Sequence, residues 1–269
     1  MIHWAIQANA GWAAPPGRTP FETPHPRAEL TAAERSRLEA LHVPQRRADW
    51  LLGRTAAKSV VGQALRNAIP GDWHPGALEI TSEPSGMPYA RLAPEAAPTA
   101  GFAPGERLPV SVTISHTAGH ALCAATWTAP AAAAPPLALG IDLGLVEPRS
   151  PAFIDTFFTD AEQRWVRTAP WWERDLRANL VWCAKEAVLK ALGLGLTVDT
   201  RSVECRPEPG GADPVLWPLA PAEAAWSPFT ATCAPALLPE GGTVRGIWRA
   251  FPGFVGALAS RTGAASEAR

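Results

Sequence analysis

The pattern of apolar and polar positions predicts strands in two separate stretches of the chain. Residues 110–116 alternate, with Val110, Val112 and Ile114 apolar and the residues between them polar, which is the period of a half-buried strand. Comparable runs predict strands at 79–82, 89–92, 121–128, 137–142, 202–206, 229–233, 245–250 and 254–259. The apolar start of the chain predicts one more short strand, and a proline-rich connector follows it up to residue 30.

Helices are predicted between these strands. Thr31-Ala32-Ala33-Glu34 has the form of a capping box and predicts a helix to about Leu41, where Pro44 ends it. A second helix is predicted over 45–65, and Thr159 to Glu162 has the form of another helix cap. Strong helix formers at 180–192, followed by two glycines, predict a further helix of about three turns.

The helix at 180–192 has two distinct faces. An apolar stripe runs through Val181, Ala184, Val188 and Leu192. Glu186 and Lys190, spaced i,i+4, lie together on the opposite side, and Lys185 falls on the apolar arc. One interpretation is a solvated Glu–Lys pair with Lys185 extending to water. The other is a functional site, since the 24 basic residues of the chain include only three lysines and two of them lie here.

Composition excludes several classes of protein. The chain has 269 residues, 47% of them hydrophobic, and a formal charge of -1 with a pI of about 6.6, so neither nucleic acid nor a membrane surface is an expected partner. No secretory signal and no run of 18 apolar residues appears, which predicts a soluble, cytoplasmic protein. We also expect a monomer. The four cysteines lack C-x-x-C spacing; we expect buried free thiols and no zinc site.

The Ala/Pro run at 129–136 is the best internal boundary. It separates two stretches that each combine helices and strands, so the predicted fold class is α+β with two related halves. We expect an N-terminal half at 1–130, a C-terminal half at 137–260 and a disordered tail at 261–269.

Candidate chemistry concentrates in the C-terminal half. Asp142 ends an apolar strand and Glu186 lies on the predicted helix; such carboxylates suit Mg²⁺, which is usually bound together with substrate phosphates. Lys185, Lys190 and the arginines near 46–54 could offset phosphate charge, although cations on a helix such as Arg47, Arg54 and Lys58 are also typical of a solvated face. P-loop, dinucleotide-binding and nucleophile-elbow motifs are absent.

These residues resemble a known family. Gly140-Ile141-Asp142, Phe157-Phe158-Thr159 with Glu162, and the run Trp182-Cys183-Ala184-Lys185-Glu186 to Lys190 are similar to the signature of 4'-phosphopantetheinyl transferases. Ile114-Ser115-His116-Thr117 and the basic helix from Arg47 resemble their large Sfp-like class, so that the resemblance covers roughly residues 30–260.

The resemblance implies a holo-[acyl-carrier-protein] synthase type of enzyme. Such an enzyme transfers phosphopantetheine from coenzyme A to a serine of a carrier protein of fatty acid, polyketide or nonribosomal peptide synthesis and releases 3',5'-ADP. The implied fold is a pseudodimer with the active site in the cleft between its halves. Asp142 and Glu186 would hold Mg²⁺, and Lys190 and Lys185 would offset phosphate charge. Arg47, Arg54, Ser115 and His116 would hold the nucleotide end, although a lone histidine such as His116 is also an ordinary turn residue.

Two positions depart from the family pattern. Gly144 stands where many relatives have an acid, which removes a third metal ligand, and Met87 stands where a cation is common, a loss that Arg91 could replace. Gly144→Glu is expected to strengthen metal binding if the loop accepts a side chain. The proton acceptor is Glu186, Glu162 or a metal-bound water. The alternatives are a non-catalytic coenzyme A or carrier-protein binding module and a plain α+β scaffold.

Overall fold

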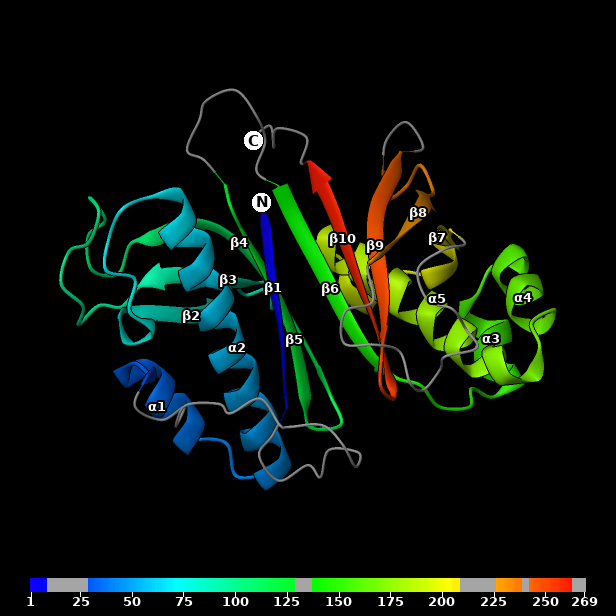
Figure 1. Cartoon of the computed structure of the whole chain (residues 1–269), viewed down its shortest axis with the longest axis horizontal. Helices are drawn as coiled ribbons and strands as arrows, with labels where there is room; N and C mark the ends of the chain where they lie inside the picture. Colours follow the sequence, from blue (N-terminus) through cyan, green and yellow to red (C-terminus); the bar gives the residue numbers. More distant parts are fainter. Residues whose placement is uncertain (9–28, 129–136, 209–225, 239–241, 263–269) are drawn as a thin grey trace. The chain divides into compact units, whose positions relative to one another are not determined.

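A computed structural model describes residues 1–8, 29–128, 137–208, 226–238 and 242–262. The chain divides into two compact units, an N-terminal unit at Met1–Leu137 (unit 1) and a C-terminal unit at Ala138–Thr262 (unit 2). Each unit combines one five-stranded sheet with helices (Figure 1), so the α+β class is confirmed. None of the helices in the described ranges has the length and apolar character that a membrane span requires.

Unit 1 is built on a five-stranded antiparallel sheet. Its elements are β1 (Ile2–Ala8), α1 (Ala32–Glu39), α2 (Pro44–Ala68), β2 (Leu78–Ser82), β3 (Pro88–Leu92), β4 (Arg107–Thr117) and β5 (His120–Trp127). The strands are ordered β1-β5-β4-β3-β2. Helix α2 packs on this sheet, with Val60, Val61 and Leu65 in one buried cluster with Ala121 and Ala125 of β5.

Unit 2 is built on a second five-stranded sheet. Its elements are β6 (Leu137–Leu145), α3 (Pro151–Phe157), α4 (Asp160–Arg167), α5 (Trp171–Ala191), β7 (Val203–Pro207), β8 (Ser227–Cys233), β9 (Thr243–Phe251) and β10 (Phe254–Thr262). The strands are ordered β6-β10-β9-β8-β7. Helix α5 packs mainly against β10, and its apolar side joins Val203, Phe229 and Val255 in the core.

The two units share one topology. In each, the first strand pairs with the last, and the remaining strands follow in reverse order to an edge formed by the second strand, β2 or β7. A long helix, α2 or α5, covers each sheet. This repetition matches the expectation of two related halves, whereas the pseudodimeric arrangement of those halves stays a prediction.

Several boundaries differ from the prediction, among them the end of β6, which lies at Leu145 and not at Asp142. Helix α5 begins at Trp171 and not at 180, because its first turns already bury Leu176 and Ala178. Pro44 starts α2, since proline fits the first turn of a helix, where its missing N–H has no partner to lose. Strand β10 continues to Thr262, two residues into the expected tail, and residues 263–269 lie outside the described ranges. All four cysteines are buried and free, as predicted.

Candidate active site

One face of α5 is partly exposed and carries two of the predicted site residues, Glu186 and Lys190. Trp182, Glu186 and Lys190 follow one another at i,i+4 spacing and are partly exposed, whereas Cys183 and Ala187 are fully buried. This arrangement confirms the predicted faces of the helix. It also means that Glu186 and Lys190 reach the surface of unit 2 from a helix whose other side is fixed in the core.

Gly140 brings β6 against the backbone of this helix. A Cβ atom at Gly140 would lie 1.9 Å from the carbonyl oxygen of Ala187 and 2.4 Å from the backbone nitrogen of Ala191. Only a residue without a side chain allows so close an approach of strand and helix. The close approach places Asp142, two residues further along β6, beside the last turn of α5.

The result is a cluster of two carboxylates and one ammonium group, formed by Asp142, Glu186 and Lys190 and called the carboxylate–lysine cluster below. The Nζ atom of Lys190 lies 2.7 Å from Oδ1 of Asp142 and 3.8 Å from Oε2 of Glu186. It also donates a hydrogen bond of 3.0 Å to the carbonyl oxygen of Ile141. Residues far apart in sequence thus meet at one point.

Burial and the neighbouring charges both act on the carboxylate of Glu186. Burial raises its pKa, the charge of Asp142 raises it further, and Lys190 offsets only part of this. Two carboxylates that share one cation form a donor set suited to a hard divalent ion such as Mg²⁺. The described residues include no group of three or more His, Cys, Asp and Glu side chains placed for a metal. The assignment of Asp142 and Glu186 as metal ligands stays a prediction.

The structure changes the expectation for Gly144. A Cβ atom at this position would lie 2.6 Å from Sγ of Cys183, which is fully buried in the core under α5. Any side chain at position 144 therefore meets the interior of unit 2, and Gly144→Glu cannot simply add an oxygen ligand.

Lys185 lies in a different place from the carboxylate–lysine cluster. Its Nζ atom is 2.8 Å from Oε2 of Glu162, and neither side chain is more than 1% exposed. The interpretation in which Lys185 extends to water is therefore wrong. Its catalytic role stays a prediction.

The residues predicted to hold a nucleotide all belong to unit 1. Arg47 donates from Nη1 to the carbonyl oxygens of Leu38 and Leu41, the latter at 3.0 Å, and so fastens the α1–α2 connection. Arg54 stacks on the Trp50 ring at 5.0 Å, and burial lowers its pKa. Ser115 is buried and His116 is exposed at the end of β4. Their role in nucleotide binding stays a prediction.

Arg91 is poorly suited to replace a cation at Met87. Its Nε and Nη2 atoms both donate to Oε1 of Glu79, at 2.9 and 2.5 Å. Glu79 is buried, so the positive charge of Arg91 is already paired within the sheet. Met87 itself is exposed in the β2–β3 turn.

Comparison with known proteins points to the same segment as the geometry. No match to a curated protein was found. Residues 138–234, which contain the whole carboxylate–lysine cluster, match the family model of the 4'-phosphopantetheinyl transferase superfamily.

Proposed function

We propose that the chain transfers the 4'-phosphopantetheine group of coenzyme A to a serine hydroxyl of a carrier protein and releases 3',5'-ADP. The observation that carries this proposal is the position of Lys190, which lies between Asp142 and Glu186 inside the segment that matches the transferase family. Sequence resemblance beyond that segment suggests the large Sfp-like class.

The reaction forms a bond between the serine oxygen and the β-phosphorus of coenzyme A and breaks the bond from that phosphorus to 3',5'-ADP. The serine proton must leave, and negative charge must be held on the phosphoryl oxygens. Lys190 is the candidate donor to those oxygens, since its ammonium group lies at the partly exposed end of the cluster. Glu186 is the candidate acceptor of the serine proton, because its carboxylate is partly exposed beside Lys190 in the cluster.

Asp142 and Glu186 would hold Mg²⁺, and the ion would supply electrostatic stabilisation of the phosphates when bound. Glu162 is not proposed as the base. Its carboxylate is buried and accepts hydrogen bonds from the backbone nitrogens of Thr159 and Cys205 in addition to its ion pair with Lys185.

The test is to incubate the protein with coenzyme A, Mg²⁺ and a panel of apo carrier proteins and to weigh the carriers. A gain of the phosphopantetheine mass is expected. Glu186→Gln should lower turnover by about 10²-fold or more, the usual contribution of a general base. Glu173→Gln is the matched control, because Glu173 forms an i,i+4 pair with Arg177 on the same helix, with an O–N distance of 2.6 Å, and is not part of the cluster.

The alternative is a module that binds coenzyme A or a carrier protein without turnover. No observation favours it over transfer. Binding of coenzyme A by calorimetry with every carrier unmodified would establish it in place of the enzyme.

A further inference from the structure

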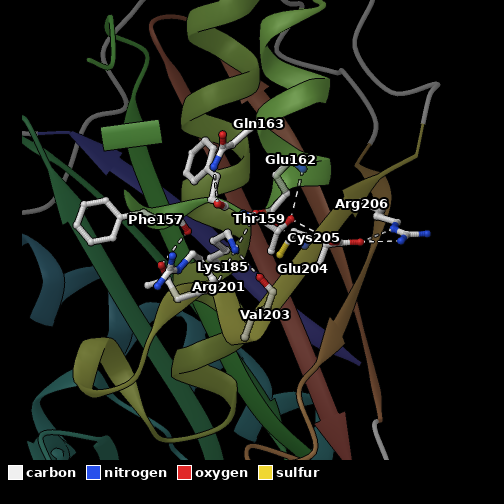
Figure 2. Close-up of polar contacts among 12 residues, drawn as sticks. Phe157, Thr159, Glu162, Gln163, Lys185, Arg201, Val203, Glu204, Cys205 and Arg206 are labelled. Carbon is white, nitrogen blue, oxygen red and sulfur yellow. Dashed lines mark hydrogen bonds and ion pairs between the residues drawn. The ribbon is translucent and has the colours of Figure 1, made fainter. Parts of the chain in front are cut away.

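All three hydrogen-bond donors of the Lys185 ammonium group have partners inside unit 2. In addition to the ion pair with Glu162, Nζ donates a hydrogen bond of 2.9 Å to the carbonyl oxygen of Thr200 and another to that of Val203 (Figure 2). An ammonium group has three donors and no acceptor. With these three oxygens as partners, Lys185 has no donor left for a phosphate.

Glu162 connects this lysine to two further elements. Its Oε2 atom accepts from the backbone nitrogen of Thr159 at 2.8 Å, which completes the capping box at the start of α4. Its Oε1 atom accepts from the backbone nitrogen of Cys205, in the edge strand β7, at 2.7 Å. One buried carboxylate therefore joins α4, β7 and α5 (Figure 2). We call the Glu162–Lys185 pair and these bonds the clamp.

Unit 1 contains the same arrangement. Glu34 completes a capping box with Thr31 at the start of α1, and its Oε1 atom accepts from the backbone nitrogen of Ile80, in the edge strand β2, at 3.0 Å. Its Oε2 atom lies 2.5 Å from Nζ of Lys58 on the long helix α2, and Lys58 also donates to the carbonyl oxygen of Glu29. Both pairs are buried. Burial lowers the pKa of Lys58 and raises that of Glu162, because it disfavours the charged form of each group.

The repeated pair in unit 1 shows that the buried pair does not require the residues proposed for catalysis. Counted from the lysine of each pair, unit 1 has Ser59 and Gln63 where unit 2 has Glu186 and Lys190. Unit 1 therefore keeps the buried pair although it has no acid or second lysine at those helix positions. A feature present where the charged residues are missing is explained by the packing of helix on sheet edge and not by contact with substrate.

We propose that Lys185 and Glu162 act as positioning residues, with the clamp fixing α5 against β7 so that Glu186, the next residue, faces Asp142. This inference rests on the proposed function. Removing one member of a buried ion pair leaves an unpaired buried charge, whereas removing both does not. We therefore expect the effects of substituting Glu162 and Lys185 to be non-additive.

The experiment is a double-mutant cycle of Glu162→Gln, Lys185→Met and the double variant, measured as kcat at saturating substrates on folded protein. The clamp predicts that both single variants lower kcat, by up to about 10²-fold for a displacement near 1 Å, with KM for coenzyme A little changed. It also predicts that the double variant is no worse than the poorer single variant. A Lys185→Met loss far larger than that of Glu162→Gln, or losses that multiply, would overturn the inference in favour of direct contact with substrate.

Hydrogen exchange gives a readout that does not need activity. The clamp predicts faster amide exchange in β7 and in the second half of α5 for Glu162→Gln but not for the control Glu173→Gln. Unchanged exchange in both segments would refute the clamp even if the wild type transfers no phosphopantetheine. Faster exchange together with an inactive wild type would refute only the proposed function. Glu34→Gln with Lys58→Met is expected to show the same non-additivity in the urea midpoint of unfolding.

Discussion

Gly140→Ala tests how the site is assembled. The added Cβ atom would lie 1.9 Å from the Ala187 carbonyl oxygen, 2.4 Å from the Ala191 nitrogen and 2.9 Å from Cβ of Lys190. Two of these atoms belong to the backbone of α5, so no rotation of a side chain can relieve the overlap. Strand and helix must move apart.

The size of the effect follows from the overlap. Ordinary contact begins at about 3.5 Å, so α5 must shift by roughly 1.5 Å relative to β6. Overpacking of this kind typically costs about 1–3 kcal/mol of folding free energy. The same shift separates Asp142 from Glu186 and Lys190, and a displacement near 1 Å can cost about 10²-fold in rate.

Urea unfolding and the carrier mass assay measure the two effects. Gly62→Ala is the matched control: its nearest new neighbours are the terminal atoms of the flexible Arg66 side chain, 3.1 Å away or more, and alanine is favoured over glycine in a helix by about 1 kcal/mol. We expect Gly62→Ala to keep or raise stability and Gly140→Ala to lose both stability and turnover. Wild-type stability and turnover in Gly140→Ala would show that the close approach of β6 and α5 is not what holds Asp142 beside Lys190.

Three further predictions concern buried groups. Gly144→Glu should lower stability and leave Mg²⁺ affinity in calorimetry unimproved, because its Cβ atom would lie 2.6 Å from Sγ of Cys183; tighter metal binding with normal stability would contradict this. The native protein should react slowly with a thiol reagent at pH 8 and expose four thiols in urea, since burial raises the pKa of all four cysteines; rapid modification of the native protein would be the opposite result. Burial lowers the pKa of His120, so its neutral form stabilises the fold above the ordinary histidine pKa and this contribution is lost as pH falls below it. His120→Gln should therefore flatten the fall in urea midpoint between pH 7 and 5, and an identical fall in both proteins would count against this.

Local sequence patterns predict much of the fold, and they also predict that Glu186 and Lys190 share one face of their helix. Both capping boxes, at Thr31 and Thr159, are present as predicted, because a cap depends on residues three positions apart. The common face of Glu186 and Lys190 likewise follows from helical spacing alone. The start of α5 was missed because Trp171 and Trp172 are exposed and hide the amphipathic pattern of its first turns.

Contacts between distant segments could not be predicted. The pairing of Lys190 with Asp142 depends on the close approach at Gly140, which no periodicity shows. The buried partner of Lys185 is a capping residue 23 positions earlier, and a capping box gives no sign that its glutamate also binds a lysine. The repetition of this pair at Glu34 and Lys58 depends on the strand order that the two sheets share, and residue spacing along the chain does not show that order.

The proposed transfer is tested most directly by the mass of an apo carrier protein after incubation with coenzyme A and Mg²⁺, compared between the wild type, Glu186→Gln and Glu173→Gln. We expect the wild type and Glu173→Gln to add phosphopantetheine to the carrier serine and Glu186→Gln to be slower by about 10²-fold. Equal transfer by all three proteins would contradict the assignment of the carboxylate–lysine cluster as the active site.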